Sequence, residues 1–156
     1  MLTLLNLDVN SSIPEKILAC NPVLEAFGNS KTVRNENSSR FGKYVKIFFG
    51  KNYNITGAAI ESYLLEKSRV SQVPINERNF HVFYALTKTG YMGAEKAENY
   101  EYLNRSGCYE AKDIDDEVSF HNIQNSLIKI GFSKEEEEKI WRLLLVILQL
   151  GNLKFE

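Results

Sequence analysis

The sequence predicts an α+β fold in which an antiparallel hairpin of two strands is followed by several helices. Residues 41–49 are rich in β-branched and aromatic side chains, and a second strand-like run covers residues 55–65. The segment 50–54 between them has the Gly and Asn content of a turn. After residue 65, apolar side chains recur at helical spacing. These three observations indicate the α+β class.

The first element along the chain is a helix that begins near Ser12. Ser12 is a suitable cap, Pro14 lies in the first turn, and Glu15 comes three residues after the cap. Apolar residues continue at helical spacing at Ile17, Leu18, Val23, Leu24 and Phe27. We expect Pro22 to bend or break this helix, because proline removes a backbone hydrogen bond. Gly28 then ends the helix, and the chain enters a polar loop.

The strand at 41–49 lacks a consistently polar face. Such a strand is typical of a sheet that is covered on both sides, so we expect neighbouring structure on each face. The turn at 50–54 reverses the chain into the strand at 55–65, which completes the hairpin.

Three helices are predicted after the hairpin. The first ends at Gly90 and the second at Gly131. Their apolar stripes are Phe80, Phe83, Tyr84 and Thr87 in the first, and Phe120, Ile123, Leu127 and Ile130 in the second. A capping box at 133–136 begins the third helix, and residues 135–138 are expected to form a solvated acidic turn. Residues 140–150 are apolar almost all round, as expected of a buried helix.

Neither histidine is predicted to bind a metal. His81 could be a ligand in principle, but a single histidine on a helix dense in aromatic residues is more often a packed core residue. His121 lies beside the second stripe without a second ligand, which indicates a surface or structural position. An acidic cluster at 113–117 lacks the spacing and the distant Glu of a calcium loop, so a helix-capping role is favoured. Its members are Asp113, Asp115, Asp116 and Glu117.

Composition and charge limit the classes of function. The 156 residues amount to one domain or less, and 44% apolar residues can bury a sizeable core. The net charge of −1 gives no electrostatic reason to expect nucleic acid or a membrane surface as a partner. No apolar run approaches the ~20 residues needed to cross a bilayer, and no targeting signal stands out. Cys20 and Cys108 lie far apart, which favours buried, reduced thiols in a cytosolic protein.

The segment 35–43 carries the most specific chemistry in the chain. Its sequence is Asn35-Glu36-Asn37-Ser38-Ser39-Arg40-Phe41-Gly42-Lys43. Adjacent hydroxyls suit a hard cation such as Mg²⁺, carboxamides can donate to phosphate oxygens, and a guanidinium can pair with a carboxylate or a phosphate. Together these groups suit a magnesium-bound triphosphate. The alternative is a polar loop whose Asn and Ser side chains cap and turn the backbone, and Asn-Ser-Ser alone would favour that alternative.

The longer segment 21–43 resembles switch I of the myosin motor domain. Four further stretches are similar to the same family in the same order. They cover residues 60–70, 77–84, 102–107 and 147–155. Kinesins share a related Asn-x-x-Ser-Ser-Arg motif, but they typically continue with Ser-His where this chain has Phe41 and Gly42. Myosin is therefore favoured over part of a kinesin-like motor.

Two other parts of a nucleotide site do not occur in these 156 residues. A phosphate loop needs Gly-x-x-x-x-Gly-Lys followed by Ser or Thr, whereas the two Gly-Lys pairs are followed by Tyr44 and Asn52. No Asp-x-x-Gly segment resembles switch II. We therefore expect residues 1–156 to be part of a myosin motor domain of the P-loop NTPase type, without a complete domain boundary. The phosphate loop would lie upstream and switch II downstream, and the two strands would belong to the central sheet.

The resemblance gives the loop residues their roles by position. Ser39 is expected to place its hydroxyl on Mg²⁺. Ser38 is expected to contact the γ-phosphate region and to help position the attacking water. Asn35 would donate its amide to phosphate oxygens. Arg40 would pair with a glutamate of switch II and close the site before hydrolysis.

The residues beside these four have supporting roles in the same resemblance. Phe41 and Gly42 would anchor the loop to the following strand without touching nucleotide, and Glu36 is expected to face solvent. Phosphoryl transfer depends mainly on positioning and charge stabilisation. A loop that is ordered by γ-phosphate and Mg²⁺ and released after hydrolysis can therefore bias a larger bistable element.

The implied function is an ATP-dependent, actin-based cytoskeletal motor. Mg²⁺ would be the cofactor, ATP the substrate, and the actin filament and the rest of the myosin heavy chain the partners. The implied location is the cytoplasm, at the cytoskeleton, with no role for nucleic acid or a membrane segment. The alternative is a truncated or non-enzymatic fragment. Because a phosphate loop would supply most backbone donors and the key lysine, the chain alone is expected to have no ATPase activity.

Overall fold

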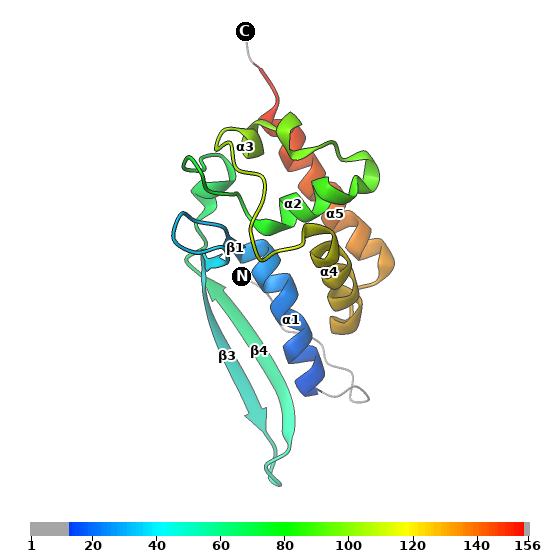
Figure 1. Cartoon of the computed structure of the whole chain (residues 1–156). Helices are drawn as coiled ribbons and strands as arrows, with labels where there is room; N and C mark the ends of the chain where they lie inside the picture. The colour runs from blue at the N-terminus through cyan, green and yellow to red at the C-terminus, as the bar shows by residue number, and fades with distance from the viewer. Residues whose placement is uncertain (1–12, 155–156) are drawn as a thin grey trace.

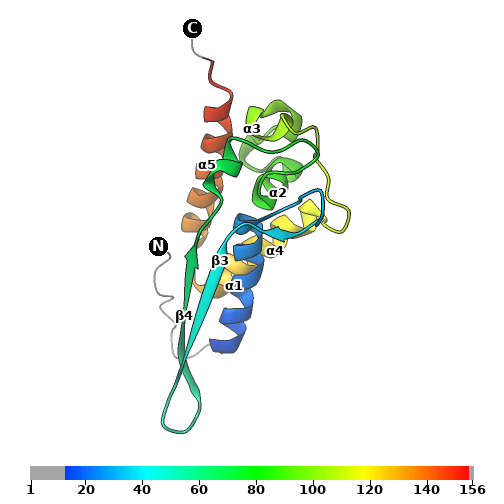
Figure 2. The ribbon, with the colours of Figure 1, turned by 90° about the vertical axis from the view of Figure 1, so that its left-hand side faces the viewer.

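A two-stranded hairpin projects from a group of packed helices (Figures 1 and 2). The computed structural model describes residues 13–154. Within this range, one helix precedes the hairpin and the other helices follow it. Short 3₁₀ turns occur at Lys67–Val70, Tyr91–Gly93 and Ala97–Asn99. The predicted α+β arrangement of a hairpin followed by helices is therefore confirmed.

Strands β3 (Gly42–Phe49) and β4 (Ile55–Tyr63) form the predicted hairpin. They pair antiparallel along their whole length, and a bulge follows Phe48. The second strand ends two residues earlier than predicted. Its end coincides with Leu64, whose φ of 55° takes the backbone out of the extended conformation.

The expectation that the first of these strands is covered on both sides is wrong for the described residues. On β3, Tyr44 is 57% exposed and Phe48 is 48% exposed. Coverage comes mainly from α1, which packs along β4, where Ala58 is buried. Figure 1 shows the reason, because the helices lie to one side of the hairpin and its far end extends past them.

Helix α1 (Ile13–Gly28) runs without interruption through Pro22, so the predicted break is wrong. Proline lacks an N–H and crowds the carbonyl four residues earlier, which belongs to Leu18. Leu18 is 66% exposed and Pro22 is exposed as well, so the proline lies on the solvent-facing side of the helix, where it is tolerated. The buried residues of α1 are Ala19, Cys20, Ala26 and Gly28. The predicted cap, Ser12, lies outside the described residues, and Gly28 ends the helix as predicted.

Helices α2 (His81–Thr89) and α4 (Asp116–Ile130) pack against α1 and against each other. All eight residues of the two predicted apolar stripes are buried. Each helix is followed by a glycine with a left-handed backbone, Gly90 at φ 65° and Gly131 at φ 109°. This conformation favours glycine because it has no Cβ.

The acidic cluster before α4 caps the helix, as predicted. The Asp115 carboxylate accepts hydrogen bonds from the backbone N–H groups of Glu117 and Val118, both at 3.0 Å. His121 is exposed on the same helix, which confirms the predicted surface position. Among residues 13–154 no group of three or more His, Cys, Asp or Glu side chains is arranged to hold a metal ion.

Helix α5 (Lys134–Gly151) begins with the predicted capping box, in which the Ser133 hydroxyl accepts from the Glu136 N–H at 3.2 Å. The prediction of a helix buried on all sides is wrong for the described residues. Trp141 is fully buried, whereas Leu143 is 61% exposed. Val146 and Leu150 are also exposed, at 43% and 55%, so α5 is buried along one face only.

The acidic first turn of α5 is solvated except at Glu137, which is 0% exposed and therefore contradicts the expectation for that residue. Its carboxylate accepts from Trp141 Nε1 at 2.5 Å and from Gln124 Nε2 at 2.8 Å, and it pairs with Lys134. Burial acts to raise the pKa of this carboxyl, but the three donors hold that pKa below its usual range.

Two short elements complete the fold. Helix α3 (Glu101–Asn104) is a single turn beside α5, and the ring of Tyr102 lies directly against Gly151. Strands β1 (Asn29–Ser30) and β2 (Ser38–Ser39) pair antiparallel and close the polar loop between them. No helix among residues 13–154 is long and apolar enough to cross a membrane.

Candidate functional site

The predicted site residues lie together on a loop whose two ends are joined. Residues 31–37 connect β1 to β2, with Asn29 opposite Ser39 and Ser30 opposite Ser38. Beyond this pair the Arg40 N–H donates to the Gly28 carbonyl at 2.7 Å. The loop therefore leaves the end of α1 and returns to it before β3 begins.

The tip of the loop is held by its own hydrogen bonds. The Thr32 N–H donates to the Asn35 carbonyl at 2.8 Å, and the Asn37 N–H donates to Asn35 Oδ1 at 2.8 Å. The carboxamide oxygen of Asn35 is thus used inside the loop. Its carboxamide nitrogen, the donor side, has no partner among the described residues.

The hydroxyl of Ser39 belongs to a hydrogen-bond network of two carboxamides and an imidazole beside the loop. Ser39 Oγ donates to Asn29 Oδ1 at 3.1 Å, and Asn29 Nδ2 donates to Asn37 Oδ1 at 2.9 Å. His81 Nε2 lies 3.2 Å from the same Asn37 oxygen. His81 is buried, as predicted for a core residue, but sequence reasoning missed its contact with the loop because the two segments are 44 positions apart.

Burial of His81 strongly favours its neutral form. Burial, together with the nearby positive charge of Arg78, lowers the pKa of His81 to about 3, although the charge of Glu36 acts in the opposite direction. At neutral pH the ring is therefore uncharged and can donate only one proton. Its Nδ1 is buried and has no hydrogen-bond partner among the described residues.

Acidification is expected to weaken α2 through His81. The folded pKa lies below the ordinary value, so the unfolded chain gains a proton first, and stability is lost as pH falls from about 6.5 toward 3. Between pH 7 and pH 5 the local unfolding free energy should fall by about 2 kcal/mol. Hydrogen exchange of α2 in a myosin head carrying this segment measures it. A His81→Gln variant should lose much less, and an equal loss would exclude His81 as the cause.

Arg40 has a carboxylate partner within this chain. Its Nε lies 2.5 Å from Glu66 Oε2, and its NH1 donates to Ser38 Oγ at 3.3 Å. Glu66 also accepts from Arg69 Nε at 2.9 Å. Burial acts to raise the pKa of the Glu66 carboxyl, but the two guanidinium groups hold that pKa below its usual range.

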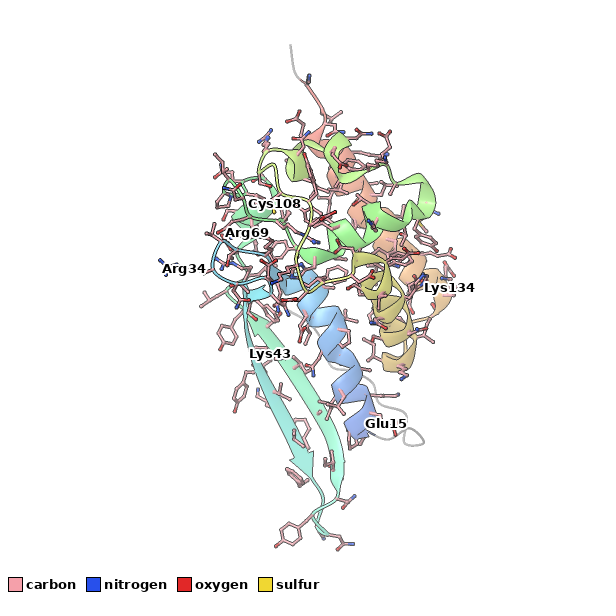
Figure 3. All side chains as sticks on the ribbon, viewed as in Figure 1. Glu15, Arg34, Lys43, Arg69, Cys108 and Lys134 are labelled. Carbon is pink, nitrogen blue, oxygen red and sulfur yellow. The ribbon has the colours of Figure 1, made fainter. Side chains whose placement is uncertain are left out.

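Arg69 is linked through carboxylates to the tip of the loop and to its C-terminal end. It is only 2% exposed and lies 2.9 Å from Glu77 Oε2, in an ion pair that is not aligned as a hydrogen bond. The other oxygen of Glu77 accepts from the Val33 N–H at 3.3 Å. Glu66 and Glu77 thus join Arg69 to Arg40 and to Val33, respectively. Figure 3 shows Arg69 inside the molecule. Arg34, which belongs to the loop at 31–37, points away from the molecule.

Glu36 is the one residue beside the four predicted site residues that differs from expectation. Glu36 is only partly exposed and accepts from the Lys112 N–H at 2.8 Å, so the expectation that it simply faces solvent is wrong. This backbone hydrogen bond is the main reason that the pKa of Glu36 lies below its usual range. The ring of Phe41 lies against Gly28, where a Cβ would be 2.3 Å from the ring. This contact ties the end of the loop to α1.

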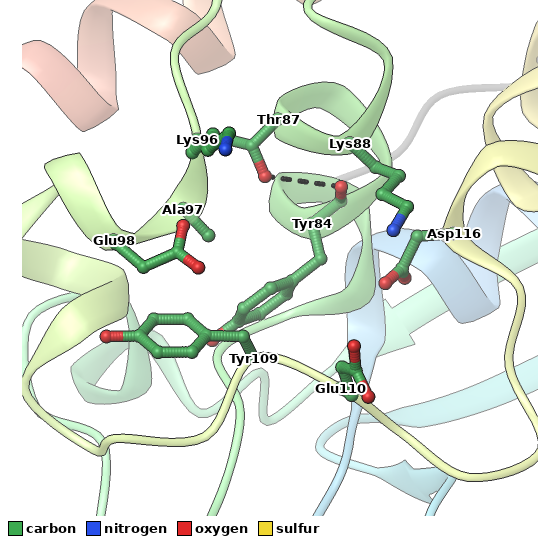
Figure 4. Close-up of a pocket in the computed structure, with 9 residues that line it drawn as sticks. All are labelled: Tyr84, Thr87, Lys88, Lys96, Ala97, Glu98, Tyr109, Glu110 and Asp116. Atoms are coloured by element: carbon green, nitrogen blue, oxygen red, sulfur yellow. Dashed lines mark hydrogen bonds between the residues drawn. The ribbon is translucent and has the colours of Figure 1, made fainter.

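A cavity of about 360 Å³ lies beside α2 (Figure 4). It is lined by Tyr84, Thr87, Lys88, Lys96, Ala97, Glu98, Tyr109, Glu110 and Asp116. None of these residues belongs to the loop. Its basic and acidic side chains are mixed, so the cavity does not favour a ligand of one charge.

Of the two free cysteines, Cys20 is buried as predicted, whereas Cys108 is only partly buried, which corrects that expectation.

Known proteins match this chain over most of its length. Residues 6–156 match the family described as myosin head (motor domain). Myosin-1 of Aspergillus clavatus is 46% identical over 149 residues, which are 92% of this chain and 12% of that protein. Myosin-5 of Arabidopsis thaliana is 47% identical over 149 residues, 92% of this chain and 10% of the relative.

A third relative extends the same pattern. The Myosin-J heavy chain of Dictyostelium discoideum is 43% identical over 154 residues, 95% of this chain and 7% of the relative. The chain thus spans roughly a tenth of the length of the curated relatives it matches. Identity above 40% across fungal, plant and amoebal proteins, together with the family match over residues 6–156, leads to one conclusion. This chain belongs to the myosin head (motor domain) family.

Proposed function

We propose that residues 31–40 form the switch I loop of an ATP-dependent, actin-based motor. In this proposal the chain is part of a myosin motor domain of the P-loop NTPase type. The observation that carries it is the set of side chains on one closed loop. Ser38 and Ser39 are adjacent on β2, Arg40 follows directly, and Asn35 keeps its donor nitrogen without a partner among the described residues.

The donor set of the loop fits a magnesium–nucleotide complex. Mg²⁺ usually keeps several waters and takes one or two protein oxygens together with phosphate oxygens. Ser39 is exposed, and its hydroxyl donates a hydrogen bond to Asn29 Oδ1, which leaves the oxygen lone pairs available. When bound, Mg²⁺ would neutralise charge on the phosphate oxygens.

The roles of the remaining loop residues follow from their contacts. Ser38 would contact the γ-phosphate and the attacking water, with its oxygen held by Arg40 NH1 at 3.3 Å. Asn35 would donate its carboxamide N–H to a phosphate oxygen. Arg40 would close the site by pairing with a carboxylate of switch II. This division of work is almost entirely positioning, as phosphoryl transfer requires.

Two exposed apolar surfaces support a place within a larger heavy chain. One lies on β3 and includes Tyr44 and Phe48, and the other lies on α5 and includes Leu143 and Leu150. Contiguous exposed apolar side chains usually mark contacts with other protein. We propose that the rest of a myosin heavy chain covers these surfaces, that the complete motor binds the actin filament, and that it works at the cytoskeleton in the cytoplasm. As a separate polypeptide the chain would be a non-enzymatic fragment, because its 156 residues contain no phosphate loop.

The test compares Ser39→Ala with Ser38→Ala in a complete myosin head that carries this segment. Ser39→Ala removes an oxygen from the proposed metal shell, so the Mg²⁺ concentration for half-maximal nucleotide binding should rise by about 10-fold. Ser38→Ala leaves that shell intact. It should slow single-turnover ATP hydrolysis by roughly 10-fold with little change in the Mg²⁺ requirement.

A generic polar turn makes a different prediction, because alanine at either position would then have the same effect. Titration of Mg²⁺ against a bound fluorescent nucleotide, followed by single-turnover hydrolysis, separates the two cases. Identical Mg²⁺ profiles for Ser39→Ala and Ser38→Ala would remove the metal role from Ser39.

A further inference from the structure

We propose that Asn29 is a positioning residue for the Ser39 hydroxyl: it accepts a hydrogen bond from the hydroxyl and so directs the oxygen lone pairs toward the cation. This inference rests on the proposed function, in which Ser39 binds Mg²⁺. Asn29 lies outside the loop, at the first position of β1, and is only 4% exposed. It is the residue directly opposite Ser39 in the strand pair.

The first step is the direction of the hydrogen bond between these two residues. Ser39 Oγ lies 3.1 Å from Asn29 Oδ1, and a carboxamide oxygen can only accept. The Ser39 proton therefore points to Asn29. A hydroxyl that binds a metal must point its proton away from the metal, so an acceptor at this place prepares the oxygen for a cation.

The second step is what fixes the orientation of the Asn29 amide. Its Nδ2 donates to Asn37 Oδ1 at 2.9 Å. The Asn37 amide is oriented in turn by Glu25, which lies 3.5 Å from Asn37 Nδ2 and, being a carboxylate, can only accept. The Asn37 oxygen must then face Asn29 and His81, and the Asn29 oxygen must face Ser39.

His81 is the last member of this hydrogen-bond network. With a neutral ring, His81 donates from Nε2 to Asn37 Oδ1 at 3.2 Å, while Nδ1 carries no proton and needs no acceptor. Two donors therefore meet on one carboxamide oxygen. Every hydrogen bond in the network runs in one direction, so it fixes the rotation of the Ser39 hydroxyl as well as its position.

The experiment is a double-mutant cycle in a complete myosin head that carries this segment. The measured quantity is the Mg²⁺ concentration that half-saturates the complex with a fluorescent ADP analogue, which does not depend on turnover. Ser39→Ala and Asn29→Ala should each raise it by about 10-fold. If Asn29 acts through Ser39, adding Asn29→Ala to Ser39→Ala should change it by less than about 2-fold.

Two further variants separate positioning from packing. Asn29→Asp keeps the size of the side chain and an acceptor for the hydroxyl but loses the donor to Asn37, so Mg²⁺ affinity should fall clearly less than with Asn29→Ala. Ser30→Ala is the matched control, because Ser30 is the next residue of β1, is fully buried and has no hydrogen-bond partner for its hydroxyl among the described residues. It should leave Mg²⁺ affinity unchanged.

Each outcome bears on the proposal. An Asn29→Ala effect that persists in full on top of Ser39→Ala, or an Asn29→Asp variant as weak as Asn29→Ala, would overturn the positioning role while Ser39 remains a metal ligand. If Ser39→Ala itself leaves Mg²⁺ affinity unchanged, the proposed function fails, and this inference fails with it.

Discussion

Replacing Arg40 with alanine in a complete myosin head is expected to slow ATP hydrolysis by about 100-fold while changing nucleotide affinity by less than about 3-fold. The guanidinium uses Nε for Glu66 and NH1 for Ser38, and its NH2 has no partner among the described residues. Arg40 NH2 is therefore available to a switch II carboxylate, which would reach it only when the site closes. The loss should therefore fall on the closed, hydrolysis-competent state.

Glu66 is a carboxylate partner of Arg40 within this chain, so the experiment must distinguish it from the proposed partner in switch II. Glu66 and a switch II glutamate are rival carboxylates, and charge reversal distinguishes them. Rapid-quench measurement of the hydrolysis step should show that Arg40→Glu is partly rescued by the reciprocal change in switch II. Glu66→Arg should not rescue it, because Glu66 is also bound to the buried Arg69. Double reversals that are no better than the single changes would exclude the switch II pairing.

The parts of the fold that were predictable are those with local signals. The hairpin was visible because turn residues separate two β-rich runs, and α4 was visible because its apolar stripe ends at Gly131. The capping box at Ser133 uses only residues three positions apart, so it could be predicted in full. The four candidate site residues are likewise neighbours in sequence, and their loop brings them together.

The contacts that hold the loop were not predictable in the same way. Arg40 and Glu66 are 26 positions apart, and Asn37 and His81 are 44 apart. Polar contacts over such distances leave no periodic pattern, and a single side chain such as His81 fits a core position equally well without them. Glu137 was missed for a different reason: its partner Trp141 is only four positions away, but an acidic first turn is usually solvated and does not show that one of its members is buried.

Exposure was the other property that the sequence did not determine for this chain. Residues 140–150 and 41–49 have the composition of covered elements, yet α5 and β3 leave apolar side chains exposed among the described residues. Burial is a relation between an element and its neighbours, so composition alone predicts a need for cover. It does not predict which segment provides it.

Together these contacts attach the loop to the helical core. Arg69 is linked through its two carboxylate partners to the tip of the loop and to Arg40 at its C-terminal end. The backbone N–H of Arg78 donates to the Lys31 carbonyl at 3.0 Å, and its side chain reaches α4. Buried charged groups therefore connect the loop to α2 and α4, and a defect in those groups should disturb the loop.

The largest effect on stability is expected at Arg78. This side chain is 0% exposed, makes a two-point ion pair with Asp116 at 2.7 and 3.1 Å, and stacks 3.9 Å from the centre of the Tyr84 ring. Arg78→Met leaves the Asp116 charge buried without its partner, which should cost about 3–5 kcal/mol. Hydrogen exchange of α2 and α4 in a complete head measures the change in local unfolding free energy.

Removing the second charge should reverse most of that loss. Burial raises the pKa of the Asp116 carboxyl above its usual value even though Arg78 acts to lower it, so the pair gains little from being ionised. Arg78→Met combined with Asp116→Leu should therefore be within about 1 kcal/mol of the wild type. The control is Arg34→Met, an exposed arginine on the loop, which should change stability by less than about 0.5 kcal/mol. If the double variant is as unstable as Arg78→Met alone, lost packing on Tyr84 rather than an unpaired charge is the cause, and the electrostatic account of Arg78 is wrong.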